Sequence, residues 1–379
     1  MLAHTGHHLV SALLTPLLPF IRDELVLDYT QAGVLFSAFN ISYGLSQLPA
    51  GWFADRFGPR LTLTIGVVGV AAAGLLAGLS TTYLMLAGVL VLMGLAGGGY
   101  HPSAAPLVSA SVEPKNRGKA LGIHQIGGTV SFFLAPIIAA GIAGALGWRG
   151  TFITLSIPTI AFGLVFYALL GRMGQTSRPK PKTSDAPTEE LPTQINLRRL
   201  IAFLILGIAS MVLIYSTITF IPLYIVDRLG ESKEIGATMV ALVFSGGIWA
   251  GPLGGYLSDR IGRVSVLLSV GLIGGPAIYL MTMTEYGLAL WVLLVTIGMA
   301  MHLGMPVVEA YVISHVPKHR RSTILGIYYL GSRGGPGVMA PVIGYFIDSH
   351  GFTTSFSLVA AAITAITMFC AILLWGNRD

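Results

Sequence analysis

The chain is short of charge and of cysteine. Only 10% of its 379 residues are charged, whereas 54% are hydrophobic; a typical soluble domain has about 25% charged residues. Too little polar surface is available to cover a soluble globule of this size, so most of the chain is expected to face lipid. The single cysteine, Cys370, excludes an internal disulfide and a cysteine-based metal cluster.

Other absences exclude further functional classes. No Gly-x4-Gly-Lys-Ser/Thr motif is present, so this chain alone is not expected to drive transport with ATP. The longest polar segment, residues 172–198, is too short for a catalytic domain, and an enzyme would need a paired acid–base or metal site, so no enzyme is expected. The net charge of +6 is spread over short loops, which argues against a nucleic-acid partner.

Long apolar runs make up nearly the whole chain. A membrane-spanning helix needs about 20 such residues, and we predict twelve, at approximately 2–21, 30–54, 61–79, 83–111, 119–146, 150–171, 199–226, 234–257, 264–283, 286–314, 322–347 and 352–375. The expected fold is an all-α integral membrane protein of two six-helix halves, 1–171 and 199–379. The polar, proline-rich segment 172–198 is predicted to be a flexible linker.

Basic residues predict the orientation of the helices. Seventeen of the 22 lysines and arginines fall in the loops on one side, four fall on the other, and Arg333 alone lies within a predicted span. Lysine and arginine accumulate on the cytoplasmic side, so both termini are expected to be cytoplasmic.

The two halves repeat one another at an offset of 204 residues. "GWFADRFGPR" at 51–60 returns as "GGYLSDRIGR" at 254–263, "RGKALGI" at 117–123 as "RSTILGI" at 321–327, and "GWRGTF" at 147–152 as "GFTTSF" at 351–356. Asp23 likewise matches Asp227. Two like halves joined by a linker are typical of a parallel-repeat transporter.

"GWFADRFGPR" resembles the loop signature of the major facilitator superfamily, and the resemblance covers essentially the whole chain. "YHPSAA" at 100–105 and "HQIGGTVSFFLAP" at 124–136 are also similar to the fosmidomycin-resistance group of exporters. The resemblance implies a monomer in the bacterial cytoplasmic membrane, in contact with lipid. Its first, fourth, seventh and tenth helices would line one central cavity, and the two halves would expose that cavity to either side in turn. A proton gradient, rather than a cofactor, would supply the energy.

The repeated loop is predicted to form a cytoplasmic latch. The resemblance implies that Asp55 faces helix eleven and that Asp259 faces helix five, where Arg321 and Arg117 are candidate partners. The full set of predicted latch residues is Gly51, Asp55, Arg56, Gly58, Arg117, Asp259, Arg260 and Arg321. The alternative is that these basic loop residues only fix the orientation of the helices.

Helix five carries small residues around Pro136 in "GIHQIGGTVSFFLAPIIAA". The spacing resembles the antiporter signature of the family, in which exporters exchange substrate for protons. The alternative is ordinary close packing of small residues.

Charges inside the membrane are expensive and point to function. Glu309 is predicted to carry the coupled proton, and Arg333 is predicted to contact an anionic substrate; a hydrogen bond to Tyr328 or Tyr329 and an ion pair are the structural alternatives. His101 and His124, at matching depths on helices four and five, are predicted to contact substrate or relay protons.

Further polar residues complete the predicted substrate site. They are Gln125, Tyr43, Tyr215 and His302, and His4, His7 and His8 repeat at helical spacing near the start of the chain. No ligand spacing supports a metal site. The predicted function is secondary transport of a small organic anion or amphipathic compound, by proton-coupled export. The alternative is proton-coupled uptake or facilitated diffusion of an organic acid.

Overall fold

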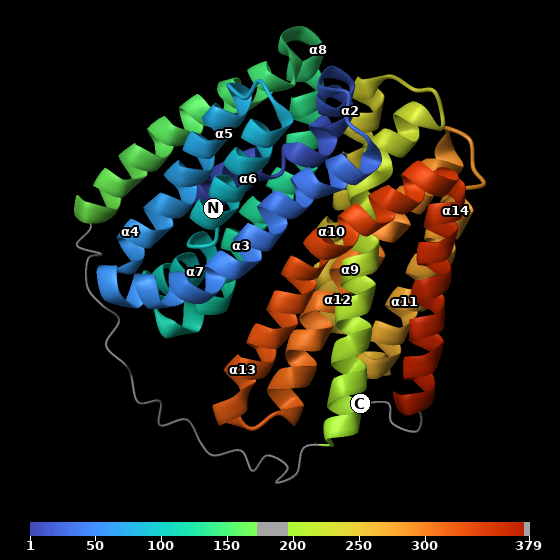
Figure 1. Cartoon of the computed structure of the whole chain (residues 1–379). Helices are drawn as coiled ribbons and strands as arrows, with labels where there is room; N and C mark the ends of the chain where they lie inside the picture. The colour runs from blue at the N-terminus through green and yellow to red at the C-terminus, as the bar shows by residue number, and fades with distance from the viewer. Residues whose placement is uncertain (173–195, 375–379) are drawn as a thin grey trace.

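The computed structural model describes residues 1–172 and 196–374, and its regular structure there is entirely helical (Figure 1). The N-terminal half contains α1 (Leu2–Ser11), α2 (Leu14–Leu25), α3 (Tyr29–Phe57), α4 (Pro59–Thr64), a π-turn (Ile65–Gly69), α5 (Val70–Gly78), α6 (Tyr83–Gly97), α7 (Tyr100–Ala110), a 3-10 turn (Pro114–Asn116) and α8 (Arg117–Arg172). The C-terminal half contains α9 (Leu197–Asp227), α10 (Lys233–Ile261), α11 (Arg263–Met281), α12 (Leu288–His315), α13 (Lys318–Tyr329), a π-turn (Leu330–Gly334) and α14 (Gly335–Leu374). The predicted all-α fold is confirmed.

These helices account for the twelve predicted spans once breaks and turns are considered. Seven helical segments are by themselves long and apolar enough to cross a membrane, and two of them, 119–172 and 323–374, are 54 and 52 residues long. Each of these two turns back at a glycine with a positive φ, 69° at Gly147 and 77° at Gly351. The two glycines are 204 residues apart, so the same hairpin ends both halves.

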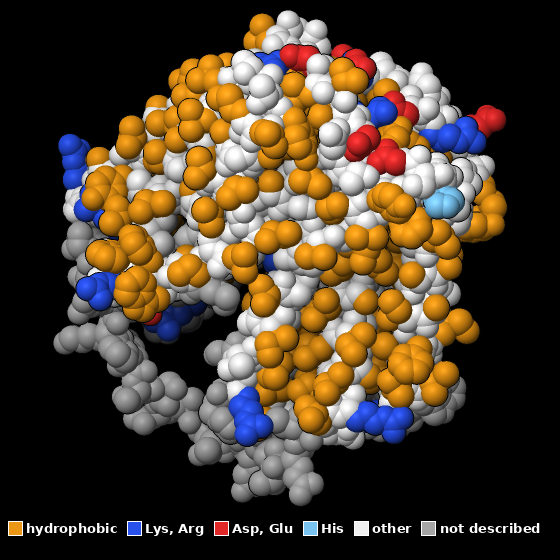
Figure 2. Space-filling view, in the orientation of Figure 1, with side chains coloured by type: hydrophobic (Ala, Val, Ile, Leu, Met, Phe, Trp, Pro, Cys, Tyr) orange, Lys and Arg blue, Asp and Glu red, His pale blue; other side chains and the backbone are white. Residues whose placement is uncertain are grey.

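Most of the predicted linker lies outside the described residues. The structure ends α8 at Arg172 and begins α9 at Leu197, and the end of α8 and the start of α9 both lie on the side of the molecule away from α2 (Figure 1). We call this the linker end. Hydrophobic side chains cover the waist of the molecule, and the acidic side chains visible on this face gather at the opposite end (Figure 2).

The two halves meet at that opposite end, which we call the closed end. Helix α3 packs along α14, and α8 packs along α10. Towards the linker end the halves separate, and the surface between them is hollowed (Figures 1 and 2). The molecule is therefore sealed at one end and open at the other.

Glycines allow α3 and α14 to touch backbone to backbone at the closed end. A Cβ added to Gly33 would lie 2.7 Å from the Ala340 carbonyl oxygen, and one added to Gly344 would lie 2.8 Å from the Thr30 amide nitrogen. Real Cβ atoms do not approach so closely, so a side chain at either position would push the halves apart.

The repeated loop signature turns at a glycine in both halves. Gly58 has a φ of 90° and Gly262 a φ of 86°, a region that glycine adopts without a steric penalty. Gly51 and Gly255, in contrast, have no atom within 4 Å of an added Cβ. Neither of these two glycines is in a close helix contact here, because the halves are apart at the linker end.

Candidate functional site

Five histidines of the N-terminal half form one cluster between α1, α7 and α8. The ring centroid of His4 lies 4.4 Å from that of His124, 4.8 Å from His8 and 5.3 Å from His101, and His7 lies 4.7 Å from His8. The cluster brings His101 and His124 to opposite sides of His4, and it adds the three histidines of α1. We call His4, His7, His8, His101 and His124 the histidine cluster.

Backbone carbonyls orient two rings of the histidine cluster. His4 Nδ1 lies 2.9 Å from the carbonyl oxygen of His124, and His7 Nδ1 lies 2.9 Å from that of Gly66. A carbonyl accepts, so the bonded nitrogen carries the hydrogen and the second nitrogen is left as an acceptor. Both second nitrogens are buried and have no hydrogen-bond partner in the described part of the chain.

Two tyrosines line the histidine cluster. Tyr100 stacks on His7 at 4.5 Å between centroids, and Tyr43 of α3 lies 6.2 Å from His7. Both hydroxyls are buried without a hydrogen-bond partner among the described residues. Because an unmade buried hydrogen bond costs about 1–3 kcal/mol, the site holds hydrogen-bonding capacity that the protein itself does not use.

Arg333 lies in the π-turn between α13 and α14, where the two halves face one another. Its charge acts on His8, His101 and Tyr43 of the N-terminal half and on Tyr215 and His302 of the C-terminal half. A π-turn inserted into a helix is frequently found at a functional site. Arg333 is therefore central to the predicted substrate residues.

No carboxylate is paired with Arg333 among the residues that the structure describes. Its one polar contact among the described residues is a long one, 3.5 Å from Nη2 to the sulfur of Met305. Glu309 instead accepts a hydrogen bond of 2.8 Å from the Tyr329 hydroxyl. Arg333 and Glu309 both act electrostatically on Tyr328 and Tyr329, so they are neighbours without forming an ion pair.

The remaining predicted site residues are less closely engaged. His302 donates through Nδ1 to the Gly298 carbonyl at 2.9 Å, one turn earlier on its own helix. Tyr215 packs edge-on against Phe36 at 5.6 Å. Gln125 is exposed on α8, on a different side of the helix from the buried His124.

Two phenylalanines connect the histidine cluster to the other half. The centroids are 4.7 Å apart for His8 and Phe132, 5.1 Å for Phe132 and Phe244, and 6.2 Å for Phe244 and His302. Neither phenylalanine is predicted from the sequence, since a phenylalanine in an apolar run does not by itself indicate a functional site. Only their contact between α8 and α10 identifies them.

The small residues of predicted helix five, which lies in α8, are closely packed. Both interpretations of that motif, the antiporter signature and ordinary packing, require this. Ala135, Ala139 and Ala140 are 5% exposed or less, and α8 packs against α1, α2 and α10. Ser131 donates to the Thr5 carbonyl at 3.2 Å, which ties α8 to α1 beside the histidine cluster.

The predicted latch residues are not engaged across the halves at the linker end. Asp55 and Asp259 are exposed, and no ion pair of either is found in the described ranges. Arg117 donates to the Ser109 carbonyl and Arg321 to the Val316 carbonyl, both within their own half. Arg56 lies over the Trp52 ring and Arg260 over the Tyr256 ring.

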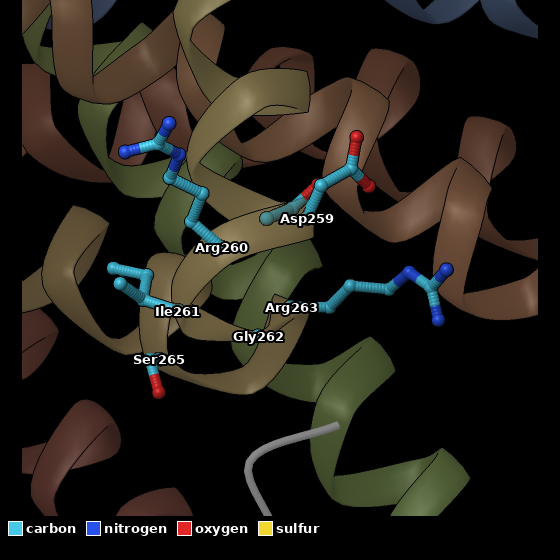
Figure 3. Close-up of a pocket in the computed structure, with 7 residues that line it drawn as sticks. Asp259, Arg260, Ile261, Gly262, Arg263 and Ser265 are labelled. Carbon is cyan, nitrogen blue, oxygen red and sulfur yellow. The ribbon is translucent and has the colours of Figure 1, made fainter.

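The second copy of the signature lines an open pocket at the linker end. Residues 258–263 and Ser265 line it, and the side chains of Asp259 and Arg263 point to one side of the loop while Arg260 points to the other (Figure 3). Arg263 donates to the Ser314 hydroxyl at 2.9 Å, so this loop is anchored to α12.

Charged residues instead join the halves at the closed end. Asp227 accepts from Arg22 at 2.7 Å and from the Tyr29 hydroxyl at 2.8 Å, and Lys233 pairs with Asp23. Asp348 accepts from the amides of Tyr29 and Thr30, each at 2.9 Å. In the sequence, Asp23 and Asp227 stand out only because they match in the internal repeat. Only the fold shows that they join the two halves at the closed end.

Comparison with known proteins identifies the family. The family model of the Major Facilitator Superfamily matches residues 1–301 and 234–379. The chain belongs to the Major Facilitator Superfamily. The relatives compared below are membrane transporters and not enzymes, and this chain shares the multi-pass helical fold of the family.

Two relatives illustrate the range of this family. The chain is 25% identical over 248 residues to the hexuronate transporter of Bacillus subtilis, covering 64% of this chain and 59% of that relative. It is 26% identical over 379 residues to the multidrug resistance protein MdtG of Salmonella paratyphi C, covering 97% of this chain and 91% of the relative. The chain thus spans less than two thirds of the first relative and nearly all of the second.

A solved structure supports the fold of this chain. A bacterial homolog of the human lysosomal transporter Spinster, crystallised in an inward-facing and occupied conformation, superimposes with a TM-score of 0.76 at 18% identity. The match covers 98% of this chain and 93% of the other. At this identity the likeness shows the twelve-helix fold alone.

Proposed function

We propose that this protein cotransports a small organic anion with protons by alternating access. The observation that carries the proposal is Arg333, which lies between the halves with no carboxylate partner in the described structure. An arginine stays charged, and a charge within a membrane protein is costly unless it is paired or hydrated. A carboxylate entering from the open linker end would supply the missing partner, through two parallel hydrogen bonds to the guanidinium.

The groups around Arg333 suit an organic anion rather than a bare inorganic one. Tyr43 brings a buried hydroxyl without a described partner, and Tyr215 faces the same charge from the other half. The aromatic rings of both would pack against the body of the ligand while the hydroxyls bond its polar groups. The resemblance to a hexuronate transporter supports a sugar acid or similar carboxylate.

The electrostatics favour protons and anion moving together. Protonation of His8 or His101 adds positive charge beside Arg333, and protonation of Glu309 removes negative charge from the same neighbourhood. Each event strengthens anion binding, and by reciprocity a bound anion strengthens proton binding. Ligands that bind cooperatively to one site are carried in the same direction, which favours symport over exchange for an anionic substrate.

Proton-coupled export of an amphipathic compound is the second candidate. It is supported by the nearly full-length match to a multidrug resistance protein and by the small-residue motif of helix five. In this case a neutral or cationic substrate would compete with the proton near Glu309, so the linkage would have the opposite sign.

Anion binding by the Arg333→Gln variant tests the proposal. Purified protein would be titrated with galacturonate, galactonate and sulfoacetate, with Arg198→Gln as a matched control because it removes an exposed arginine outside the predicted site. Losing one partner of a buried charge pair costs about 2 kcal/mol or more, so we expect affinity to fall at least about 30-fold. Equal affinity in the variant and the wild type would overturn the anion assignment.

The orientation of the protein in the membrane and its cellular location also belong to this proposal. With the basic linker end in the cytoplasm of a bacterial inner membrane, the structure would be the inward-open state and the closed end would face outward. We propose a monomer, surrounded by lipid at its apolar waist.

A further inference from the structure

Three histidines of the cluster bring their ring nitrogens together in the geometry of a metal site. One nitrogen each from His4, His8 and His101 lies within 4.8 Å of the others. His4 and His8 are four residues apart on α1 and share one face of it, while His101 faces them from α7. No spacing in the sequence indicates this triad, because only the packing of α7 against α1 completes it.

The second nitrogen of His4 is prepared for a ligand. Its Nδ1 is held by the His124 carbonyl at 2.9 Å, and its Nε2 is buried without a hydrogen-bond partner among the described residues. A histidine that binds a metal usually donates its other N–H to a carbonyl or carboxylate, which fixes the ring and its tautomer. The residue itself is 2% exposed, so the free Nε2 points into protein and not into solvent.

We propose that His4, His8 and His101 bind one divalent transition-metal ion of the zinc class. Neutral imidazoles suit zinc, nickel and copper, and they do not suit magnesium or calcium, which prefer oxygen. A tetrahedral ion with bonds of about 2.0–2.1 Å needs nitrogens about 3.4 Å apart. The rings must therefore move inward by a small amount when the ion binds.

Arg333 determines what the fourth ligand is. Its charge acts on His8 and His101, so it would repel a bare cation at the triad. An anion in the fourth position, such as hydroxide or a carboxylate, reduces this repulsion and pairs with the guanidinium. The site is thus a three-histidine centre with one position open to an anion, an arrangement that goes beyond the proposed transport reaction. An ion bound there would replace the protons that His8 and His101 can otherwise carry, and Arg333 and Glu309 would keep their proposed roles.

Titration of the full chain with zinc tests this inference. The protein would carry a C-terminal affinity tag without histidine, because a polyhistidine tag binds zinc itself and an N-terminal tag would adjoin His4. Calorimetry should give one ion per chain. Loss of a neighbouring hydrogen-bond partner of a metal ligand weakens binding about 10- to 100-fold, so His101→Ala, which removes a ligand, should weaken it by about 100-fold or more. His350→Ala, which removes an exposed histidine outside the predicted site, is the matched control and should bind as the wild type does.

Cobalt absorption keeps the test decisive if an alanine variant folds poorly. Cobalt in the wild type should give the intense visible bands of a tetrahedral site, and His101→Cys should add a thiolate-to-cobalt band in the near ultraviolet. The native Cys370 is buried in the other half and should not contribute. Absence of stoichiometric zinc binding, equal binding by the wild type and His101→Ala, or an unchanged cobalt spectrum in His101→Cys would overturn the proposal.

Discussion

The Tyr29 hydroxyl donates to Asp227 at 2.8 Å across the two halves, and the internal repeat relates this contact to a second one. Adding 204 to 29 gives Lys233, and subtracting 204 from 227 gives Asp23, and these two residues form an ion pair across the halves. The same offset relates the predicted latch pairs, Asp55 with Arg321 and Asp259 with Arg117. The closed end thus carries two contacts related by the internal repeat, and the linker end carries the residues that are predicted to form two more.

The contacts of Asp227 should determine how firmly the closed end is sealed. Asp227 is 26% exposed and has two partners, whereas Asp23 is 68% exposed and has one. Exposed pairs contribute about 0–1 kcal/mol, and hydrogen bonds to a charged group contribute about 1.5–3 kcal/mol. Asp227→Asn should therefore shift the population towards the opposite conformation by about 5- to 30-fold, and Asp23→Asn should shift it much less.

Distances between spin labels placed on either side of the closed end would measure this shift. A larger response to Asp23→Asn than to Asp227→Asn would contradict the ranking of the two contacts.

The glycines of the α3–α14 contact should be intolerant of side chains. Gly344→Val would drive its side chain into the backbone at Tyr29 and Thr30, and overpacking of this kind costs about 1–3 kcal/mol. Because the clash exists only when the closed end is sealed, the variant should fold, favour the opposite conformation and transport slowly. Gly141→Ala, where an added Cβ meets nothing within 4 Å, is the control. Wild-type transport by Gly344→Val would show that this contact is not needed.

The predicted latch should form only when the linker end closes. In the structure Asp55 is exposed and Arg321 donates to a carbonyl of its own half, so paired cysteines at these positions should not cross-link in this state. A ligand or variant that opens the closed end, such as Asp227→Asn, should make Asp55→Cys and Arg321→Cys cross-link. Cross-linking that is insensitive to Asp227→Asn would count against a latch.

Much of the fold follows from local sequence signals. The apolar runs, the two hairpin glycines Gly147 and Gly351, and the turns at Gly58 and Gly262 depend on residues close to one another in the chain. The breaks in helices one, four and eleven were not predicted, since a kink at Ala12 or a π-turn at Arg333 depends on packing between helices.

The site was predictable only in part. Single residues such as Arg333, Glu309 and His101 stand out because polar groups are rare in apolar spans. The contacts between these residues do not stand out in the sequence. Glu309 accepts a hydrogen bond from Tyr329, so Arg333 has no carboxylate partner among the described residues. His4 joins His101 from a distant part of the chain. Such contacts have no sequence period, so only the three-dimensional structure reveals them.

Glu309 should matter for coupling more than for binding. Glu309→Gln keeps a partner for the Tyr329 hydroxyl and removes the titrating group, mimicking the protonated state. Counterflow of substrate across a membrane without a proton gradient should be retained, while accumulation driven by a pH gradient should fall by about 10-fold or more. If gradient-driven accumulation survived in the Gln variant, the coupled proton would have to reside elsewhere, with the histidine cluster as the next candidate.

Proton movement on addition of an organic anion tests the central claim most directly. Proteoliposomes enclosing a pH-sensitive dye would receive galacturonate, galactonate or sulfoacetate outside, with no starting gradient. Cotransport predicts that the lumen acidifies as the anion enters, and that Arg333→Gln abolishes the signal while Arg198→Gln retains it. Alkalinisation of the lumen by the wild-type protein, or an acidification that persists in Arg333→Gln, would contradict the account.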